Sequence, residues 1–229
     1  MCKVFRTVLA ILICVGASLE AKATVVATWT FDSGSDTTNP FDATSQSINV
    51  TSASLTVASV NGGMISHQTT GGNPNGRIRI AGNGQDVNGS VLTFQLQTSG
   101  ATFAFSSLTF DYNRADSGKS PNNINWSYSI TGGGSGSLGS STLSATGWRS
   151  DAPVTLSSIT LTPGQTLTIT GTITGPGTGN PGDLSFDNFT FNSSVTPIPE
   201  PIHLAMGIFG LIFVTAGAGR FYLARVRRA

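Results

Sequence analysis

The residues that most often carry catalysis are scarce between positions 24 and 196. His67 is the single histidine in this range, because the other of the chain's 2 histidines is His203, and the range holds no cysteine and no glutamate. A Ser-His-Asp site would therefore depend on His67, which lies in the loop-like stretch Met64-Ile-Ser-His-Gln-Thr-Thr. Zinc needs several histidine or cysteine ligands, which one histidine cannot supply. This inventory predicts that the protein is not an enzyme.

Aspartate is the remaining residue type that could act on a substrate. Nine of the 11 acidic residues lie between positions 24 and 196, and all nine are aspartates. Two carboxylates at a suitable separation can hydrolyse a glycosidic bond. These aspartates, however, lie in polar or turn-forming contexts, where aspartate usually bonds to backbone amides or to water. A glycan hydrolase is therefore the least favoured of the functions considered.

Two of these aspartates, Asp32 and Asp187, are candidates for holding a structural calcium ion. Asp32 ends the first predicted strand and Asp187 lies in the last one, and the first and last strands of a sandwich are often neighbours. The two carboxylates could then converge, with backbone carbonyls completing the oxygen ligands that calcium takes. In the simpler interpretation, which we favour, Asp32 opens a turn and Asp187 accepts hydrogen bonds from backbone amides at a bulge. The sequence therefore requires no cofactor, and calcium is the one candidate ion.

The 3 tryptophans are the residues on which a sugar ring could stack. Trp29 and Trp126 alternate in step with other apolar residues, so we expect them in the core. Trp148 lies in Thr146-Gly147-Trp148-Arg149, outside a regular alternation. It is therefore the better candidate for a contact with a glycan at the surface.

Apolar residues between positions 24 and 196 recur with a period of two. Such alternation is typical of strands with one buried and one solvated face, and clusters of Gly, Asn and Pro separate the runs. The pattern predicts an all-β fold, an antiparallel β-sandwich that is jelly-roll-like. The clearest runs are Ala27-Trp29-Phe31, Leu92-Phe94-Leu96, Leu108-Phe110-Tyr112, Ile124-Trp126-Tyr128-Ile130 and Leu167-Ile169-Gly171-Ile173.

The alternation changes parity at two places. The first change lies between Phe105 and Leu108, which predicts a bulge or corner at Ser106-Ser107. The second lies before Phe189, which predicts a bulge at Asp187-Asn188 in the last strand.

The first 23 residues have the three parts of a secretory signal peptide. Lys3 and Arg6 are followed by an uncharged run from Thr7 to Leu19 and then by the small-x-small sequence Ala21-Lys22-Ala23. Both of the chain's 2 cysteines lie in this segment, so the exported part is expected to contain no disulfide. We expect residues 1–23 to be removed and residues 24–196 to form an exported domain.

A second apolar segment lies near the carboxyl end. Between Ile202 and Gly219 there is no Asp, Glu, Lys or Arg. At ~1.5 Å per residue a helix over this range would be roughly 27 Å long, about enough to cross the hydrocarbon core of a membrane. We therefore expect a transmembrane helix at 202–219, the alternative being a buried helix of a soluble core. The arginines after it should stop transfer and keep the domain outside the cytoplasm: Arg220, Arg225, Arg227 and Arg228.

The charges also limit the partners of the exported domain. Five of the 12 basic and nine of the 11 acidic residues lie between positions 24 and 196, which gives this part a formal charge of −4. Nucleic-acid binding depends on clustered Lys and Arg. We therefore expect no nucleic-acid partner.

The tripeptide Pro199-Glu200-Pro201 directly precedes the apolar segment. Together with that segment and the terminal arginines it resembles the PEP-CTERM sorting signal of bacterial surface proteins, which here would occupy residues 197–229. The resemblance implies that Pro199, Glu200 and Pro201 are recognised by an exosortase, a membrane-embedded cysteine protease-transpeptidase. It also implies a protein that is first anchored in the inner membrane with its domain in the periplasm, and that reaches the cell surface or the extracellular space after processing.

Three stretches of the central domain also follow a known pattern: Ser107–Arg114, Asn125–Ser127 and Leu184–Asn192. They resemble the β-rich, jelly-roll-like ectodomains that often accompany PEP-CTERM tails and are associated with extracellular polysaccharide and biofilm matrix. This resemblance implies a structural or adhesive role at the cell surface or in the extracellular matrix. The alternative is a polysaccharide-binding module of the biofilm matrix.

Overall fold

The computed structural model describes residues 23–32, 39–60, 63–70, 72, 76–81, 87–116, 118–144, 146–150, 153–175 and 182–195. All of them belong to one compact unit, Glu20–Thr196. The predicted signal peptide (Ala23 aside), the predicted PEP sorting motif and the apolar segment 202–219 lie outside the described residues. Within the described ranges, no helix is long and apolar enough to cross a membrane.

Every regular element in the described part of the chain is a β-strand. The strands are β1 Ala23–Trp29, β2 Phe41–Asp42, β3 Ser45–Gln46, β4 Val50–Ala58, β5 Met64–Gln68, β6 Arg77–Ala81, β7 Val91–Thr98, β8 Phe103–Arg114, β9 Asn123–Ile130, β10 Ser135–Thr142, β11 Gly147–Arg149, β12 Val154–Thr155, β13 Thr160–Leu161, β14 Thr166–Thr174 and β15 Leu184–Val195.

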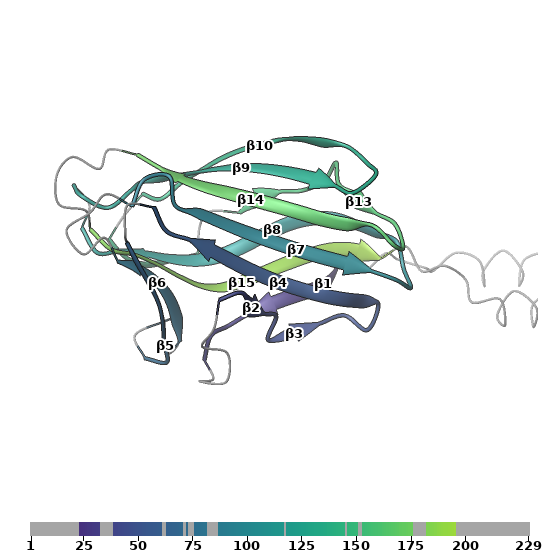
Figure 1. Ribbon diagram of the computed structural model, residues 1–229, viewed down its shortest axis with the longest axis horizontal. Coiled ribbons are helices and arrows are strands. Elements are labelled where there is room, and N and C mark those ends of the chain that lie inside the picture. The colour runs from purple at the N-terminus through teal and green to yellow at the C-terminus, as the bar shows by residue number, and fades with distance from the viewer. Residues whose placement is uncertain are drawn as a thin grey trace, which may run out of the picture. The chain divides into compact units, whose positions relative to one another are not determined.

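These strands form two antiparallel sheets that pack as a sandwich, as the alternation predicts (Figure 1). Sheet A has nine strands, with β11, β8, β15, β1 and β3 along its main path. The short strands β12 and β13 also pair with β8, and the β5–β6 hairpin joins β15 through β6. Sheet B has six strands in the order β10-β9-β14-β7-β4-β2. The chain passes repeatedly from one sheet to the other, so each sheet combines strands from distant parts of the sequence.

Aromatic side chains fill the space between the two sheets. The rings of Trp29 in sheet A and Phe94 in sheet B have centroids 5.4 Å apart. The ring centroid of Phe94 also lies 4.9 Å from that of Phe189 and 5.3 Å from that of Phe191, both in sheet A. All four side chains are fully buried. Since burial of a large apolar side chain contributes roughly 2–3 kcal/mol, these contacts hold the sheets face to face.

Both predicted bulges are confirmed where β8 pairs with β15. Between Asp187 and Thr190, β15 has one residue more than the opposite stretch of β8, and Asn188 there has a left-handed φ of 51°. Between Asn192 and Ser193 the extra residue lies in β8 instead, at Ser106. Each bulge resets the alternation, so that the aromatic residues on both sides of it face the core.

Gly171 occupies a core-facing position in β14, directly opposite Trp126 in β9. A Cβ atom at Gly171 would lie 2.5–2.9 Å from three atoms of the Trp126 ring. The indole Nε1 of Trp126 donates a hydrogen bond to Ser141 Oγ at 3.0 Å. The ring is therefore fixed at one edge by Ser141 and fits on the other side only because residue 171 has no side chain. Its burial, with 2% of its surface exposed, confirms the core position predicted for it.

Gly171→Ala should destabilise the protein, although alanine loses less backbone entropy on folding than glycine does. The added methyl group would displace the Trp126 ring, and overpacking of this kind costs roughly 1–3 kcal/mol. Urea denaturation followed by tryptophan fluorescence would measure the change. Thr172→Ala, on the solvent face of the same strand, is the matched control and should change the free energy of unfolding by less than about 0.5 kcal/mol. A Gly171→Ala variant as stable as the wild type would contradict the packing described.

Candidate functional site

A row of five side chains crosses the outer surface of sheet A from β11 to β5. Each residue lies directly opposite the next on the adjacent strand, in the order Trp148, Asn113, Ser185, Arg79 and Ser66. Directly opposite residues of antiparallel strands project to the same side of a sheet. At about 4.8 Å between strands, the row extends over roughly 19 Å. We call these five residues the polar row.

The polar row faces away from the core. The residues next to it along three of the strands, Tyr112, Phe186 and Ile78, are fully buried between the sheets. Because side chains alternate along a strand, the row must point to the other side. Trp148 is half-buried at the edge of the sheet, whereas Ser185 in the middle is covered by its neighbours. The row therefore offers an aromatic side chain at one end and hydrogen-bonding groups along the rest.

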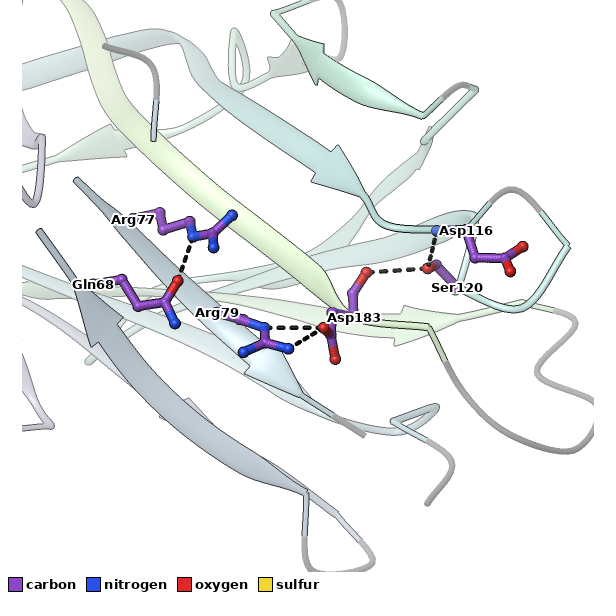
Figure 2. A network of polar contacts seen from close by, with 6 residues as sticks. All are labelled: Gln68, Arg77, Arg79, Asp116, Ser120 and Asp183. Atoms are coloured by element: carbon purple, nitrogen blue, oxygen red, sulfur yellow. Dashed lines mark hydrogen bonds and ion pairs between the residues drawn. The ribbon is translucent and has the colours of Figure 1, made fainter. Parts of the chain in front are cut away.

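An ion pair fixes Arg79 within the polar row. Its Nε donates to Asp183 Oδ2 at 3.0 Å, and its Nη2 bonds to the same oxygen. The Asp183 carbonyl accepts a hydrogen bond from Ser120 Oγ at 3.0 Å, and Ser120 Oγ accepts one from the Asp116 amide at 3.1 Å. Figure 2 shows this chain of contacts. It ties the loop before β9 to the start of β15, and it neutralises the charge of Arg79.

Arg77 lies two positions before Arg79 in β6, on the same face of the sheet. Its Nε donates to Oε1 of Gln68 at 2.6 Å, and Gln68 is directly opposite it in β5 (Figure 2). Partial burial lowers the pKa of Arg77 from its usual value, repulsion by Arg79 lowers it further, and attraction by Asp183 opposes both effects. An arginine nevertheless stays protonated in proteins. This part of the face is therefore positively charged.

Two buried aspartates lie on the same side of sheet A as the polar row. Asp111 and Asp187 are directly opposite each other in β8 and β15, and only 8% and 0% of their surfaces are exposed. Asn188 bonds to both, because its backbone amide donates to Asp187 Oδ1 at 2.8 Å and its Nδ2 donates to Asp111 Oδ2 at 2.7 Å. A pair of hydrolytic carboxylates must flank a glycosidic bond in an open site. This buried and hydrogen-bonded pair is not arranged for that reaction.

The two calcium candidates each have a backbone partner. Asp32 Oδ1 accepts a hydrogen bond at 3.0 Å from the amide of Gly76, directly before β6. Asp187 accepts its bond from Asn188 within the bulge. The Asp187 contact is of the kind that the simpler interpretation expects, whereas the turn expected after Asp32 lies outside the described residues. Among the residues that the structure describes, no group of three or more His, Cys, Asp or Glu side chains could hold a metal, and the calcium site stays a prediction.

His67 lies in β5, so the loop predicted around it is wrong. Its Nε2 lies 2.8 Å from the carbonyl oxygen of Phe31, within hydrogen-bond distance. Its ring centroid is 6.0 Å from that of Phe31 and 6.5 Å from that of Phe41. The strand was hard to recognise because one of its core-facing positions holds a histidine instead of an aliphatic residue. His67 thus has a packing role at the border of the core.

The sequence identified Trp148 but not the residues beside it. The alternation in Arg77-Ile-Arg79-Ile is itself a sign that both arginines share an outward face. What the sequence does not contain is the pairing of β6 with β15 and of β11 with β8, which joins distant segments. The sorting and stop-transfer residues lie outside the described residues: Pro199, Glu200, Pro201, Arg220, Arg225, Arg227 and Arg228.

No protein-family model and no curated protein matches the chain. Several solved structures are similar to it over much of their length. A structure described as carbohydrate binding module family 29 is 12% identical over 79% of this chain and 99% of its own, with a TM-score of 0.41. A mutant of CBM29-2 complexed with mannohexaose is 11% identical over 75% and 92%, with a TM-score of 0.39. CBM29_1 from Piromyces equi is 9% identical over 76% and 90%, with a TM-score of 0.36. At these identities and TM-scores, the similarity does not extend to what this chain binds.

Replacing Asn188 tests the bulge that supports this face. Asn188→Ala removes the hydrogen bond to Asp111. It also places alanine in the left-handed region of backbone angles, where its Cβ is unfavourable and where it cannot form the local hydrogen bonds that asparagine forms. Because a hydrogen bond to a charged group is worth about 1.5–3 kcal/mol, thermal or urea unfolding should show a loss of at least about 2 kcal/mol. Asn188→Gly is the matched variant, since glycine accepts the backbone angle but also lacks the side chain, and it should lose less. An alanine variant as stable as the glycine variant would show that the bulge carries no backbone strain.

Proposed function

We propose that residues 24–196 form an exported, non-enzymatic domain that binds extracellular polysaccharide on the outer face of sheet A. The observation that carries the proposal is the polar row, in which Trp148 stands at one end of a line of hydrogen-bonding side chains on four further strands. A sugar ring has an apolar C–H face that stacks on an indole and a rim of hydroxyl groups that need hydrogen-bond partners. The polar row supplies both kinds of contact.

The shape of the polar row favours an extended chain of sugars over a single small one. Its length of roughly 19 Å exceeds the size of one sugar ring. Asn113 and Ser66 both donate and accept hydrogen bonds, and Arg79 donates. Since these residues lie on paired strands and Arg79 is already held by Asp183, they lose little conformational freedom when a ligand binds.

Catalysis is not part of the proposal. His67 is engaged with the carbonyl of Phe31. The best-placed pair of carboxylates, Asp111 and Asp187, is buried and bonded to Asn188. These contacts favour a structural role for His67, Asp111 and Asp187 over a role in acid–base catalysis.

The location of the domain is proposed from the sequence. The leader 1–23, the motif Pro199-Glu200-Pro201 and the segment 202–219 resemble those of an exosortase substrate. The jelly-roll-like domain would first be held in the periplasm by an inner-membrane helix and then be displayed on the cell surface or released into the matrix. Binding to polysaccharide there would give the protein its structural or adhesive role.

Trp148→Ala should weaken binding to any polysaccharide that a glycan array identifies as a ligand. Loss of a central tryptophan contact typically costs about 2 kcal/mol, or roughly 30-fold in Kd. Isothermal titration with the full chain in detergent would measure the change. Arg149→Ala is the matched control, because Arg149 is exposed in the same short strand but lies on the opposite pleat, facing Tyr112. Equal binding by the wild type and Trp148→Ala would contradict the proposed surface.

Replacing Pro199, Glu200 and Pro201 by alanines tests the proposed sorting. In a host that contains an exosortase, this variant should remain in the membrane fraction as the longer form, because the processing enzyme no longer recognises it. Immunoblots of membrane and medium fractions would show this. The alanine replacement of Pro197 serves as the control, since it lies outside the tripeptide. Processing of the triple variant at the wild-type rate would rule out this sorting motif.

A further inference from the structure

Arg77 differs from Arg79 in what balances its charge. Arg79 pairs with the carboxylate of Asp183. The side-chain hydrogen bond of Arg77 goes to Gln68, a neutral amide. Within the described part of the chain, no carboxylate forms an ion pair with Arg77. On the outer face of sheet A, the guanidinium of Arg77 therefore carries a charge that the neighbouring side chains do not neutralise.

The contact with Gln68 also determines which part of Arg77 remains available. Gln68 accepts from Nε, on one edge of the planar guanidinium. In Figure 2 the dashed line from Gln68 reaches Arg77 at this nitrogen, and none of the other residues drawn bonds to its two terminal nitrogens. Two terminal N–H groups side by side form the fork that matches a carboxylate with two parallel hydrogen bonds. Gln68 thus holds the guanidinium in place through Nε and does not occupy this fork.

The surrounding charges favour an anion at this position. Arg79 lies on the same face and repels Arg77, and partial burial removes water from it. The carboxylates near Arg77 are already engaged. Asp183 is paired with Arg79, and Asp187 is buried and accepts a hydrogen bond from the Asn188 amide. Asp32 accepts a hydrogen bond from the amide of Gly76, directly before Arg77. A bound anion would relieve the repulsion and replace the lost water. A neutral ligand would do neither.

We propose that Arg77 binds a carboxylate of the ligand, so that the ligand is an acidic polysaccharide containing uronate sugars. This inference rests on the proposed function and assigns Arg77 as the residue that selects for charge. Trp148 contributes stacking to acidic and neutral chains alike, whereas Arg77 contributes only where a carboxylate is present.

The experiment compares acidic polymers with their neutral counterparts. Alginate and polygalacturonate are each tested beside their carboxyl-reduced forms, in which every uronate has become a neutral sugar of the same linkage. For the full chain in detergent, titration should show that at least one acidic polymer binds about 10-fold or more tightly than its reduced form. Arg77→Gln should remove most of this difference and leave binding of the reduced form unchanged. Arg149→Gln, which removes an exposed positive charge elsewhere on sheet A, should preserve it.

A second variant keeps the test informative if Arg77→Gln folds poorly, which circular dichroism would show. Gln68→Leu retains the charge of Arg77 but removes its anchor, and it should reduce the preference for the acidic form without abolishing it. Equal affinity for acidic and reduced polymers, or a preference that survives in Arg77→Gln, would overturn the inference while polysaccharide binding through Trp148 stands. A wild-type protein that binds no glycan at all would overturn the proposed function as well.

Discussion

The two-sided character of β15 is the constraint on which the rest of sheet A depends. One side of this strand must supply Phe186, Phe189 and Phe191 to the core, and the other must place Ser185 and Asp187 on the outer side of the sheet, where both are buried. A regular strand cannot do this, because a strict period of two would turn Phe189 and Phe191 outward. The bulge at Asn188 removes the conflict, and the bond from Asn188 to Asp111 stabilises it. Both the aromatic core and the polar row follow from this one irregularity.

The outer faces of the two sheets differ in their chemistry. On sheet B the outward positions of three adjacent strands hold residues such as Thr170, Ser127 and Thr93, which lie opposite one another and carry no charge. On sheet A the corresponding surface carries Arg77, Arg79 and the two buried aspartates. Part of this difference serves the fold, because Arg79 pairs with Asp183 and Asn188 bonds to both aspartates at the bulge. Arg77, by contrast, bonds to the neutral amide of Gln68 and forms no ion pair with any described carboxylate.

The sequence predicts those features that depend on neighbouring residues along the chain. The period of two locates the strands that contain Trp29, Phe94 and Trp126, and the changes of parity locate both bulges. It fails at His67, because a histidine in a core-facing position does not look like part of a strand. It also cannot show that Ser185 lies between Asn113 and Arg79, since that register is set by long-range pairing. Of the candidate site, the sequence therefore suggested Trp148 alone, and neither the other four residues nor their arrangement in a row was predicted.

The position of β15 within sheet A has a mechanical consequence. It is flanked by β8 on one side and by β1 and β6 on the other, and the chain leaves it at Val195 toward the residues that follow. Tension applied to that end of the chain would act along the strand, so that its hydrogen bonds on both sides would be loaded in shear together instead of opening one after another. Resistance to forced unfolding depends on the rate of unfolding and not on equilibrium stability alone, so the pairing of β15 on both sides would slow forced unfolding from that end.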